Sequence, residues 1–140
     1  MVDLQTILKG HRTKLDREKS SDHEPKIELP TFAEIPSVFF DRVLVEYKLS
    51  RIEVLVLMYL YRRVWCKQNI FKKHGISQLL SHTEMGNSLH LSIDEIHQAT
   101  RRLEEYGFIE IIRSGQYFVR KYFSREFDEM FEQTYDDFEN

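Results

Sequence analysis

The sequence has few of the residues that build disulfides, phosphate loops and metal sites. Among its 140 residues Cys66 is the only cysteine, so no disulfide forms within the chain, which fits a reducing compartment. The five glycines are scattered and make no glycine-rich phosphate loop. Cys66, His74, His82 and His90 recur at steps of eight, which is not a metal-ligand spacing, and no nucleophile triad stands out. We therefore expect neither an enzyme nor a cofactor or metal site.

Long apolar runs are also missing. The longest, Val54–Tyr61, is far too short to span a bilayer. The N-terminus carries charges at Asp3, Lys9, Arg12 and Lys14 and has no apolar core of signal-peptide length. We expect a soluble cytoplasmic protein without a membrane partner.

Charge of one sign dominates only in parts of the chain. The formal net charge is −3, but residues 1–49 carry −1, residues 50–123 carry +4 and residues 124–140 carry −6. Local charge decides whether a surface attracts phosphate, and the total for the chain hides it. The sequence therefore predicts a basic central region followed by an acidic tail.

The stretch from Ser81 to Tyr106 has the pattern of two short helices joined by a sharp corner. Ser81 with Glu84, and Ser92 with Glu95, have the spacing of a capping box, in which the serine and the glutamate each accept a backbone N–H of the other. Two helix starts this close predict a helix-turn-helix, whose second helix enters a DNA major groove. The expected helices are residues 82–90 and 93–106.

A β-hairpin is expected directly after these helices. Gly107 suits the left-handed end of a helix, and residues 108–112 and 117–123 are rich in β-branched and aromatic side chains. Ser114-Gly115 between the two runs predicts the turn, so the hairpin forms a wing. Residues 76–80 form an expected short strand before the helix-turn-helix.

The remaining segments complete the predicted fold. Ser50 and Glu53 form a third capping box, which opens a helix to about Lys67 that is apolar nearly all round, as in a central helix. Trp65, Tyr59 and Tyr61 are expected in the core. The fold class is α+β, mostly helical: a winged helix-turn-helix with a C-terminal β-hairpin wing and an extra C-terminal helix. The chain is expected to begin with a flexible N-terminal arm (1–30), which contains a weak helix at 2–15. The winged-helix domain (31–123) begins with a short helix at 37–47. An acidic amphipathic C-terminal helix or tail (124–140) follows it.

Five short stretches of the chain together resemble one known family of domains. The pattern from Phe32 to Ile112 resembles the winged-helix domain of phage and plasmid replication initiators, and its last stretch is also shared by many bacterial winged-helix transcription factors. This resemblance implies binding of duplex DNA through the third helix and the wing. The stretches are Phe32-Ala33-Glu34-Ile35-Pro36, Leu49-Ser50-Arg51-Ile52-Glu53, Arg62-Arg63-Val64-Trp65, Gly75-Ile76-Ser77 and Leu103-Glu104-Glu105-Tyr106-Gly107-Phe108-Ile109.

The exposed side chains of residues 93–106 are the main candidates for contact with double-stranded DNA. Gln98 suits adenine, and Arg101 or Arg102 suits guanine or phosphate. His97 suits either weakly, and Arg113 in the wing turn is placed to reach a phosphate or the minor groove. Each of these side chains taken alone is also an ordinary solvated residue. Flanking candidates are Arg120 and Lys121 on the second wing strand and Lys72 and Lys73 in the loop before the helix-turn-helix.

Two alternatives remain open. Asp94 and Glu95 put acids at the start of the expected recognition helix, where they stabilise the helix dipole but repel phosphate. With the acidic tail, they favour a winged-helix protein-interaction module without a DNA partner. The tail either packs against the domain or a second copy, as in a homodimer, or covers the basic surface and weakens DNA binding. On the DNA interpretation the protein is a transcriptional regulator or a replication-initiator-type factor.

Overall fold

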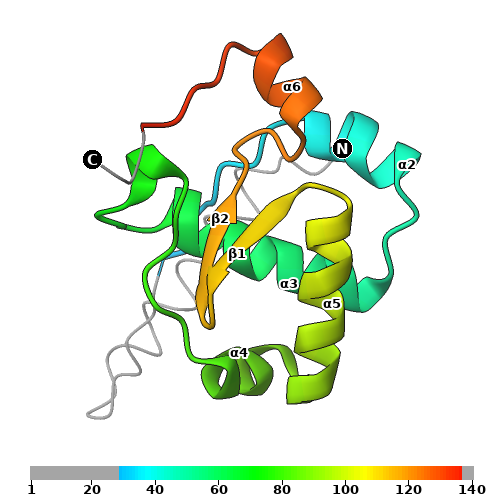
Figure 1. Ribbon diagram of the computed structural model, residues 1–140, viewed down its shortest axis with the longest axis vertical. Helices are drawn as coiled ribbons and strands as arrows, with labels where there is room; N and C mark the ends of the chain where they lie inside the picture. The colour runs from blue at the N-terminus through cyan, green and yellow to red at the C-terminus, as the bar shows by residue number, and fades with distance from the viewer. Residues whose placement is uncertain (1–28, 137–140) are drawn as a thin grey trace, which may run out of the picture. The chain divides into compact units, whose positions relative to one another are not determined.

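The structure is a computed structural model that describes residues 29–136 (Figure 1). It is an α+β structure, and the described residues from Ala33 onward, including the C-terminal helix, form one compact unit. The N-terminal helix expected at residues 2–15 lies outside the described residues. In chain order the elements are η1 (Phe39–Val43), α2 (Leu44–Glu46), α3 (Arg51–Tyr61), η2 (Arg62–Cys66), η3 (Lys72–His74), α4 (His82–Leu89), α5 (Ile93–Glu105), β1 (Ile109–Arg113), β2 (Gln116–Val119) and α6 (Arg125–Met130).

The helices predicted at residues 37–47 and from Ser50 to about Lys67 are confirmed. η1 and α2 form the short helix expected at residues 37–47, and α3 with η2 forms the long helix expected from Ser50 to about Lys67. The Ser50 hydroxyl accepts from the Glu53 N–H at 3.1 Å, and the Glu53 carboxylate accepts from the Ser50 N–H at 3.1 Å. This complete capping box fixes where α3 begins.

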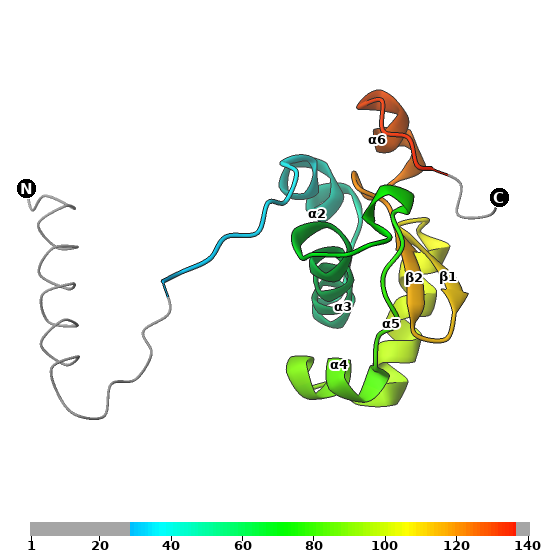
Figure 2. The ribbon, with the colours of Figure 1, turned by 90° about the vertical axis from the view of Figure 1, so that its left-hand side faces the viewer.

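α3 is the centre of the core. Val56, Leu57 and Leu60 have no exposed surface. α5 and the hairpin cover one side of α3, and α4 lies next to the start of α5 and the hairpin turn (Figures 1 and 2). At the C-terminal end of α3 the ring of Tyr61 stacks on that of Phe123, with centroids 4.8 Å apart. The apolar helix therefore holds together elements that are distant in the sequence.

The segment at residues 75–80 runs beside β2 without forming a regular strand. Only Ile76 forms a β-bridge, with Phe118, although the Ser77 N–H also donates to Tyr117 O at 2.9 Å. The Ser77 hydroxyl accepts from the Tyr117 N–H at 3.1 Å. A side chain thus replaces a main-chain partner, which explains why the predicted strand is reduced to one bridge.

The corner between α4 and α5 is tight, as expected. The Ser92–Glu95 capping box is complete, but at α4 only half of the predicted box forms: Ser81 accepts from the Glu84 N–H, and the Glu84 carboxylate lies 3.6 Å from Arg63 instead. His90 ends α4 in the left-handed conformation, with φ of 57°. These two caps and the left-handed residue set the angle at which α5 leaves α4.

Gly86 allows this corner to close. A Cβ atom at Gly86 would lie 2.7 Å from the carbonyl oxygen of Leu91. Glycine weakens an exposed helix interior, and the sequence alone marks Gly86 as a defect in α4. Its tertiary role is to let the backbone at Leu91 approach the helix.

The hairpin has the predicted turn but a shorter second strand. β1 and β2 pair antiparallel around Ser114-Gly115, and β2 ends at Val119 rather than Phe123. Phe123 is left-handed, with φ of 78°, and is fully buried. The chain therefore turns into the core after β2, and Arg120 and Lys121 lie in this turn and not on a strand.

The C-terminal helix is also shorter than predicted. α6 ends at Met130, whereas the sequence pattern indicated an amphipathic helix or tail over residues 124–140. Phe127 is buried, but Met130 and Phe131 are exposed, so the apolar stripe is not one packed helix face. The chain leaves the helix because Tyr135 folds back, and its hydroxyl donates to the Asp128 carboxylate at 2.7 Å.

Candidate nucleic-acid interface

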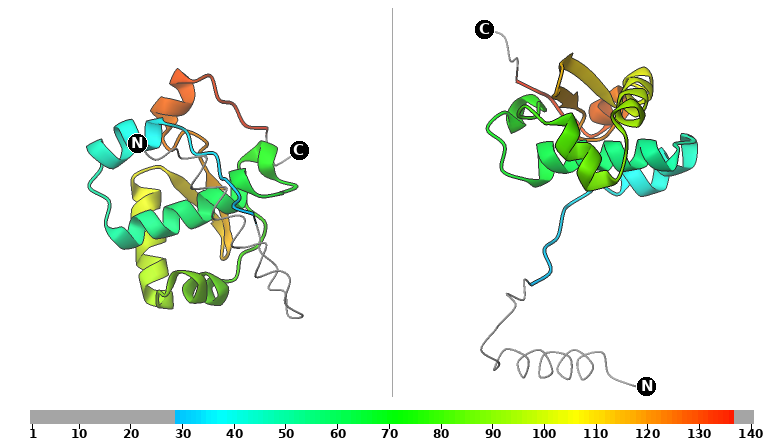
Figure 3. Two further views of the ribbon diagram at one scale, coloured as in Figure 1. Left: turned by 180° about the vertical axis from the view of Figure 1, so that it is seen from behind. Right: turned by 90° about the horizontal axis from the view of Figure 1, so that it is seen from below.

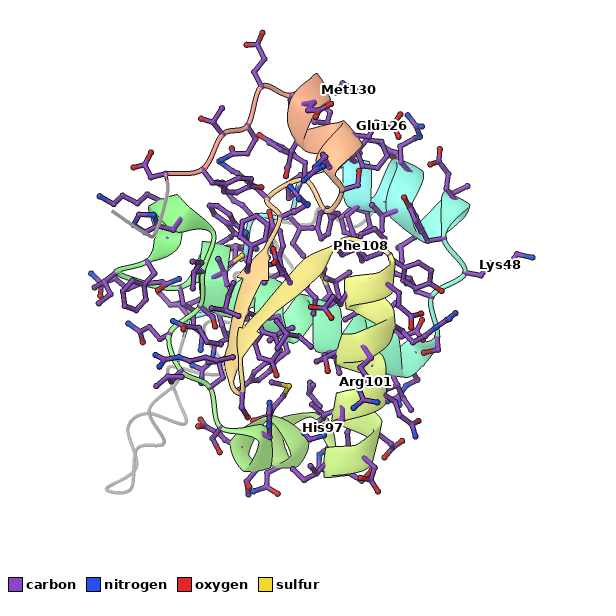
Figure 4. The ribbon with its side chains drawn as sticks, viewed as in Figure 1. Lys48, His97, Arg101, Phe108, Glu126 and Met130 are labelled. Atoms are coloured by element: carbon purple, nitrogen blue, oxygen red, sulfur yellow. The ribbon has the colours of Figure 1, made fainter. Side chains whose placement is uncertain are left out.

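The exposed side of α5 consists of two rows of side chains. Its inner face is buried on α3 through Ile96, Ala99, Thr100 and Leu103. On the outer side the spacing of four residues aligns His97 with Arg101 and, in the second row, Gln98 with Arg102. Figure 4 shows the first row along α5 above its contact with α4.

The first row lies between α4 and the hairpin. The ring of His97 is 5.1 Å from the ring of His82 on α4, in an edge-to-face arrangement. One turn beyond Arg101, the Glu104 carboxylate accepts from the N–H of Ile111 in β1 at 2.7 Å. Arg101 itself is exposed and forms no hydrogen bond or ion pair with any residue from 29 to 136. Its guanidinium is therefore available to a ligand.

The second row faces the start of α3. Gln98 and Arg102 line a hollow of about 150 Å³ together with Ser50 and Glu53. The Arg102 guanidinium lies 3.4 Å from the Glu105 carboxylate, donates to the Tyr106 hydroxyl at 2.9 Å and lies over the Tyr106 ring. Arg102 is thus engaged within its own helix, and the two arginines that the sequence presents as a pair are not equivalent.

His82 is a residue of this site that sequence reasoning missed. Its Nε2 atom lies 2.6 Å from the Tyr117 hydroxyl of β2. Burial lowers the pKa of His82, and the neighbouring His97 lowers it further. Burial also raises the pKa of the Tyr117 phenol. No local signal marks this pair, because it joins the start of α4 to a strand 35 residues away.

The tip of the hairpin is anchored. The Leu80 N–H donates to Gly115 O at 2.7 Å. Gly115 is left-handed, and a Cβ atom added to it would lie only 2.6 Å from the Leu80 carbonyl oxygen. Arg113 is exposed, and its Nε–H donates to the Gln116 side chain at 3.0 Å. The tip therefore presents Arg113 from a fixed backbone.

The Arg120 side chain is bound within the fold and is not free to contact a ligand. Its Nη1 atom lies 3.1 Å from the Asp128 carboxylate, its Nε–H donates to Gly107 O, and its side chain is only 19% exposed. Lys121 is held by its backbone: its N–H donates to the Tyr135 hydroxyl, and its carbonyl accepts from the Tyr61 hydroxyl. The structure thus separates these two residues from the hairpin on which they were predicted.

Lys72 and Lys73 lie in η3, on the opposite side of the hairpin from α5 (Figures 1 and 3). Both are exposed. The nine predicted residues therefore do not form one surface. They divide into the α5 rows, the hairpin tip, and a region around η3 and the turn after β2.

The charge of the chain divides in the same way. Residues 81–119, which contain α4, α5 and the hairpin, carry 3 basic and 6 acidic side chains, a formal charge of −3. Residues 50–80 and 120–123 carry 8 basic and 1 acidic side chains, a charge of +7. The +4 of the central region therefore does not come from α5 and the hairpin.

Cys66 lies half-buried beside the chain at Glu34. Its thiol contacts Glu34 O at 3.5 Å, and burial raises its pKa. Within residues 29–136, no group of three or more histidine, cysteine, aspartate or glutamate side chains is arranged to hold a metal ion. In the same range, no helix is long and apolar enough to cross a membrane.

Comparison with known protein families, with curated proteins and with solved structures found no match. The assignment of a function therefore depends on the residues and geometry of this chain.

Proposed function

We propose that the protein is a winged-helix protein that binds double-stranded DNA, as a transcriptional regulator or a replication-initiator-type factor. The element order supports a winged helix: α3, the segment at 75–80, α4, α5 and then the hairpin. In this proposal α5 is the recognition helix, and the hairpin is the wing beside the DNA backbone.

The observation that carries the proposal is the row formed by His97 and Arg101. It is exposed between α4 and the hairpin, and Arg101 has no partner within residues 29–136. A free arginine on a recognition helix suits the two acceptors of guanine in the major groove, and such a pair contributes about 1–3 kcal/mol of discrimination. Arg113 at the fixed hairpin tip suits a neighbouring phosphate.

The test compares Arg101 with Arg102 in the full chain. We expect duplex DNA binding whose logarithmic affinity falls with the logarithm of salt concentration. Arg101→Ala should weaken binding to a selected duplex roughly 5- to 150-fold, whereas Arg102→Ala, whose side chain is engaged with Glu105 and Tyr106, should have a smaller effect. Equal affinity of wild type and Arg101→Ala, or no duplex binding at low salt, would overturn the proposal.

A protein-interaction module without a DNA partner is the second candidate. The charge of −3 on residues 81–119 favours it, because a net acidic surface repels phosphate. Ile93 at the start of α5 and Ile112 on β1 are also 41% and 44% exposed, as suits contact with another protein. If no duplex binds to the full chain at low salt, this candidate takes precedence.

A further inference from the structure

Within residues 29–136, unpaired positive charge gathers at the C-terminal end of α3. It extends over η2, η3 and the turn after β2, and we call it the basic surface. The four exposed cations in it form no ion pair with any residue from 29 to 136. Arg63 and Arg120 are excluded from it because each forms an ion pair, with Glu84 and with Asp128. The residues of the basic surface are Arg62, Lys67, Lys72, Lys73 and Lys121.

Contacts around the end of α3 bring these cations together. Lys72 and Lys121 line a groove of about 710 Å³ together with the chain at residues 33–37, in which Glu34 is the one acidic side chain. Arg62 and Lys67 line a second hollow of about 240 Å³, in which the Glu84 carboxylate is paired with Arg63. The charges of Lys72 and Arg62 both lower the pKa of the Cys66 thiol, against the rise that burial and Glu34 cause. Cations from separate parts of the sequence thus share one region of the surface.

Aromatic rings form part of the groove wall. Trp65, expected in the core, is only partly buried; its indole N–H donates to Val119 O at 3.0 Å, which fixes the ring. The Lys121 ammonium lies 5.7 Å from the centre of the Trp65 ring and 5.9 Å from that of Tyr122. A cation held against aromatic rings rather than against a carboxylate remains able to attract an anion.

This combination fits a nucleic-acid backbone better than an acidic protein. Phosphate groups repeat along a strand and match several separate cations, each of which releases counterions when it is neutralised. Aromatic rings beside such cations accommodate bases or sugars, which an acidic peptide does not offer. The basic surface presents long, exposed side chains, which suits contact without sequence readout.

We propose that the basic surface is a second nucleic-acid-binding surface, which contacts backbone phosphates without regard to sequence. It lies on the opposite side of the hairpin from α5 (Figure 3). The protein therefore holds a nucleic-acid segment there whether or not α5 reads a DNA site, and the inference goes beyond the function proposed above.

The experiment removes three charges from the basic surface and three from elsewhere in the full chain. The test variant is Lys67→Gln/Lys72→Gln/Lys73→Gln. The matched control is Lys48→Gln/Arg51→Gln/Arg125→Gln, which removes the same charge from exposed positions before α3, at its start and on α6. The probes are a labelled 20-nucleotide oligo-dT strand and a 20-base-pair duplex of arbitrary sequence, and thermal unfolding verifies that both variants are folded.

We expect the test variant to bind both probes at least ~10-fold more weakly at low salt, with a salt slope reduced by roughly 2 to 3. The control variant should stay within about twofold of wild type, since distant exposed charges are screened. Equal losses in both variants, or wild-type binding by the test variant, would overturn the inference. So would tighter binding of a poly-glutamate peptide than of either probe, which would indicate an acidic protein partner.

The outcome separates the two proposals. If Arg101→Ala leaves binding unchanged on every duplex while the test variant loses affinity, the basic surface stands and the α5 proposal fails. If Arg101→Ala weakens binding to a selected duplex and the test variant matches its control, the reverse holds.

Discussion

The guanidinium of Arg120 lies 3.1 Å from the carboxylate of Asp128, and this pair joins the turn after the hairpin to α6. Asp128 is 3% exposed and also accepts from the Tyr122 N–H at 3.0 Å and the Tyr135 hydroxyl at 2.7 Å. Burial and the hydrogen bond to Asp128 raise the pKa of the Tyr135 phenol, which stays a donor. One carboxylate thus holds three parts of the C-terminal region.

Replacing this carboxylate should destabilise the protein strongly. Asp128→Ala leaves Arg120 and Tyr135 without their partner in a largely buried site, which costs about 3–5 kcal/mol of unfolding free energy. Urea unfolding measures the effect, with Glu129→Ala on the exposed side of α6 as the control, expected within about 0.5 kcal/mol of wild type. Equal stability of the two variants would show that the Arg120–Asp128 pair does not hold the C-terminal region.

Gly86 and Gly107 should respond differently to alanine. Gly86→Ala brings a Cβ atom to 2.7 Å from the Leu91 carbonyl, so we expect a loss of about 1–3 kcal/mol although alanine favours helices. Gly107 is left-handed, with φ of 83°, but a Cβ atom added there would meet no atom within 4 Å, so alanine costs only the backbone strain of about 1 kcal/mol. Chemical unfolding of the two variants gives the comparison, and a stabilised Gly86→Ala would contradict the close packing of the corner.

Protonation of His82 should lower the free energy of unfolding at acidic pH. In the unfolded chain its pKa is about 6.5, and in the folded protein burial and His97 lower it. The folded state therefore resists protonation: the contribution of neutral His82 is complete above about pH 6.5 and is lost as the pH falls towards the lower, folded pKa. His82→Gln should remove this part of the pH dependence. Parallel stability curves for wild type and variant between pH 7.5 and pH 5 would exclude it.

The acidic end of the chain should compete for the basic surface. The Asp136 N–H donates to Lys73 O at 3.2 Å, and His74 Nδ1 donates to Asp136 O at 2.7 Å, so Asp136 lies beside η3. We expect Asp136→Asn/Asp137→Asn/Glu139→Gln to tighten oligo-dT binding severalfold at low salt and to lose this effect at high salt.

The control for this prediction neutralises three exposed acids on η1 and α6, as Asp41→Asn/Glu126→Gln/Glu129→Gln. A similar gain in both variants would attribute the effect to net charge alone. Removal of all residues from 124 onward does not test the idea, because it deletes Phe127 from the core. Within the described residues, α6 packs on η1 and the turn after β2, through Arg42 on Phe127 and Arg120 on Asp128, rather than over α5.

Local chemistry made much of the fold predictable. The helix starts at Ser50 and Ser92 each depend on a serine and a glutamate three residues apart, and both form as the sequence indicates. The hairpin turn at Ser114-Gly115 is equally local. Patterns fail where a distant residue intervenes: α6 stops at Met130 because Tyr135 returns to Asp128, and β2 stops at Val119 because Phe123 enters the core.

The order of the helices and the hairpin, the capping boxes at Ser50 and Ser92 and the uneven charge along the chain follow from the amino-acid sequence, because they are set by residues close together in it. Which charges are free depends instead on how the chain packs. Packing pairs Arg120 with Asp128, leaves Arg101 without a partner within residues 29–136, and brings Lys72 and Lys121 to one groove. A charge is available only where packing leaves it unpaired, and packing joins residues that no short pattern connects.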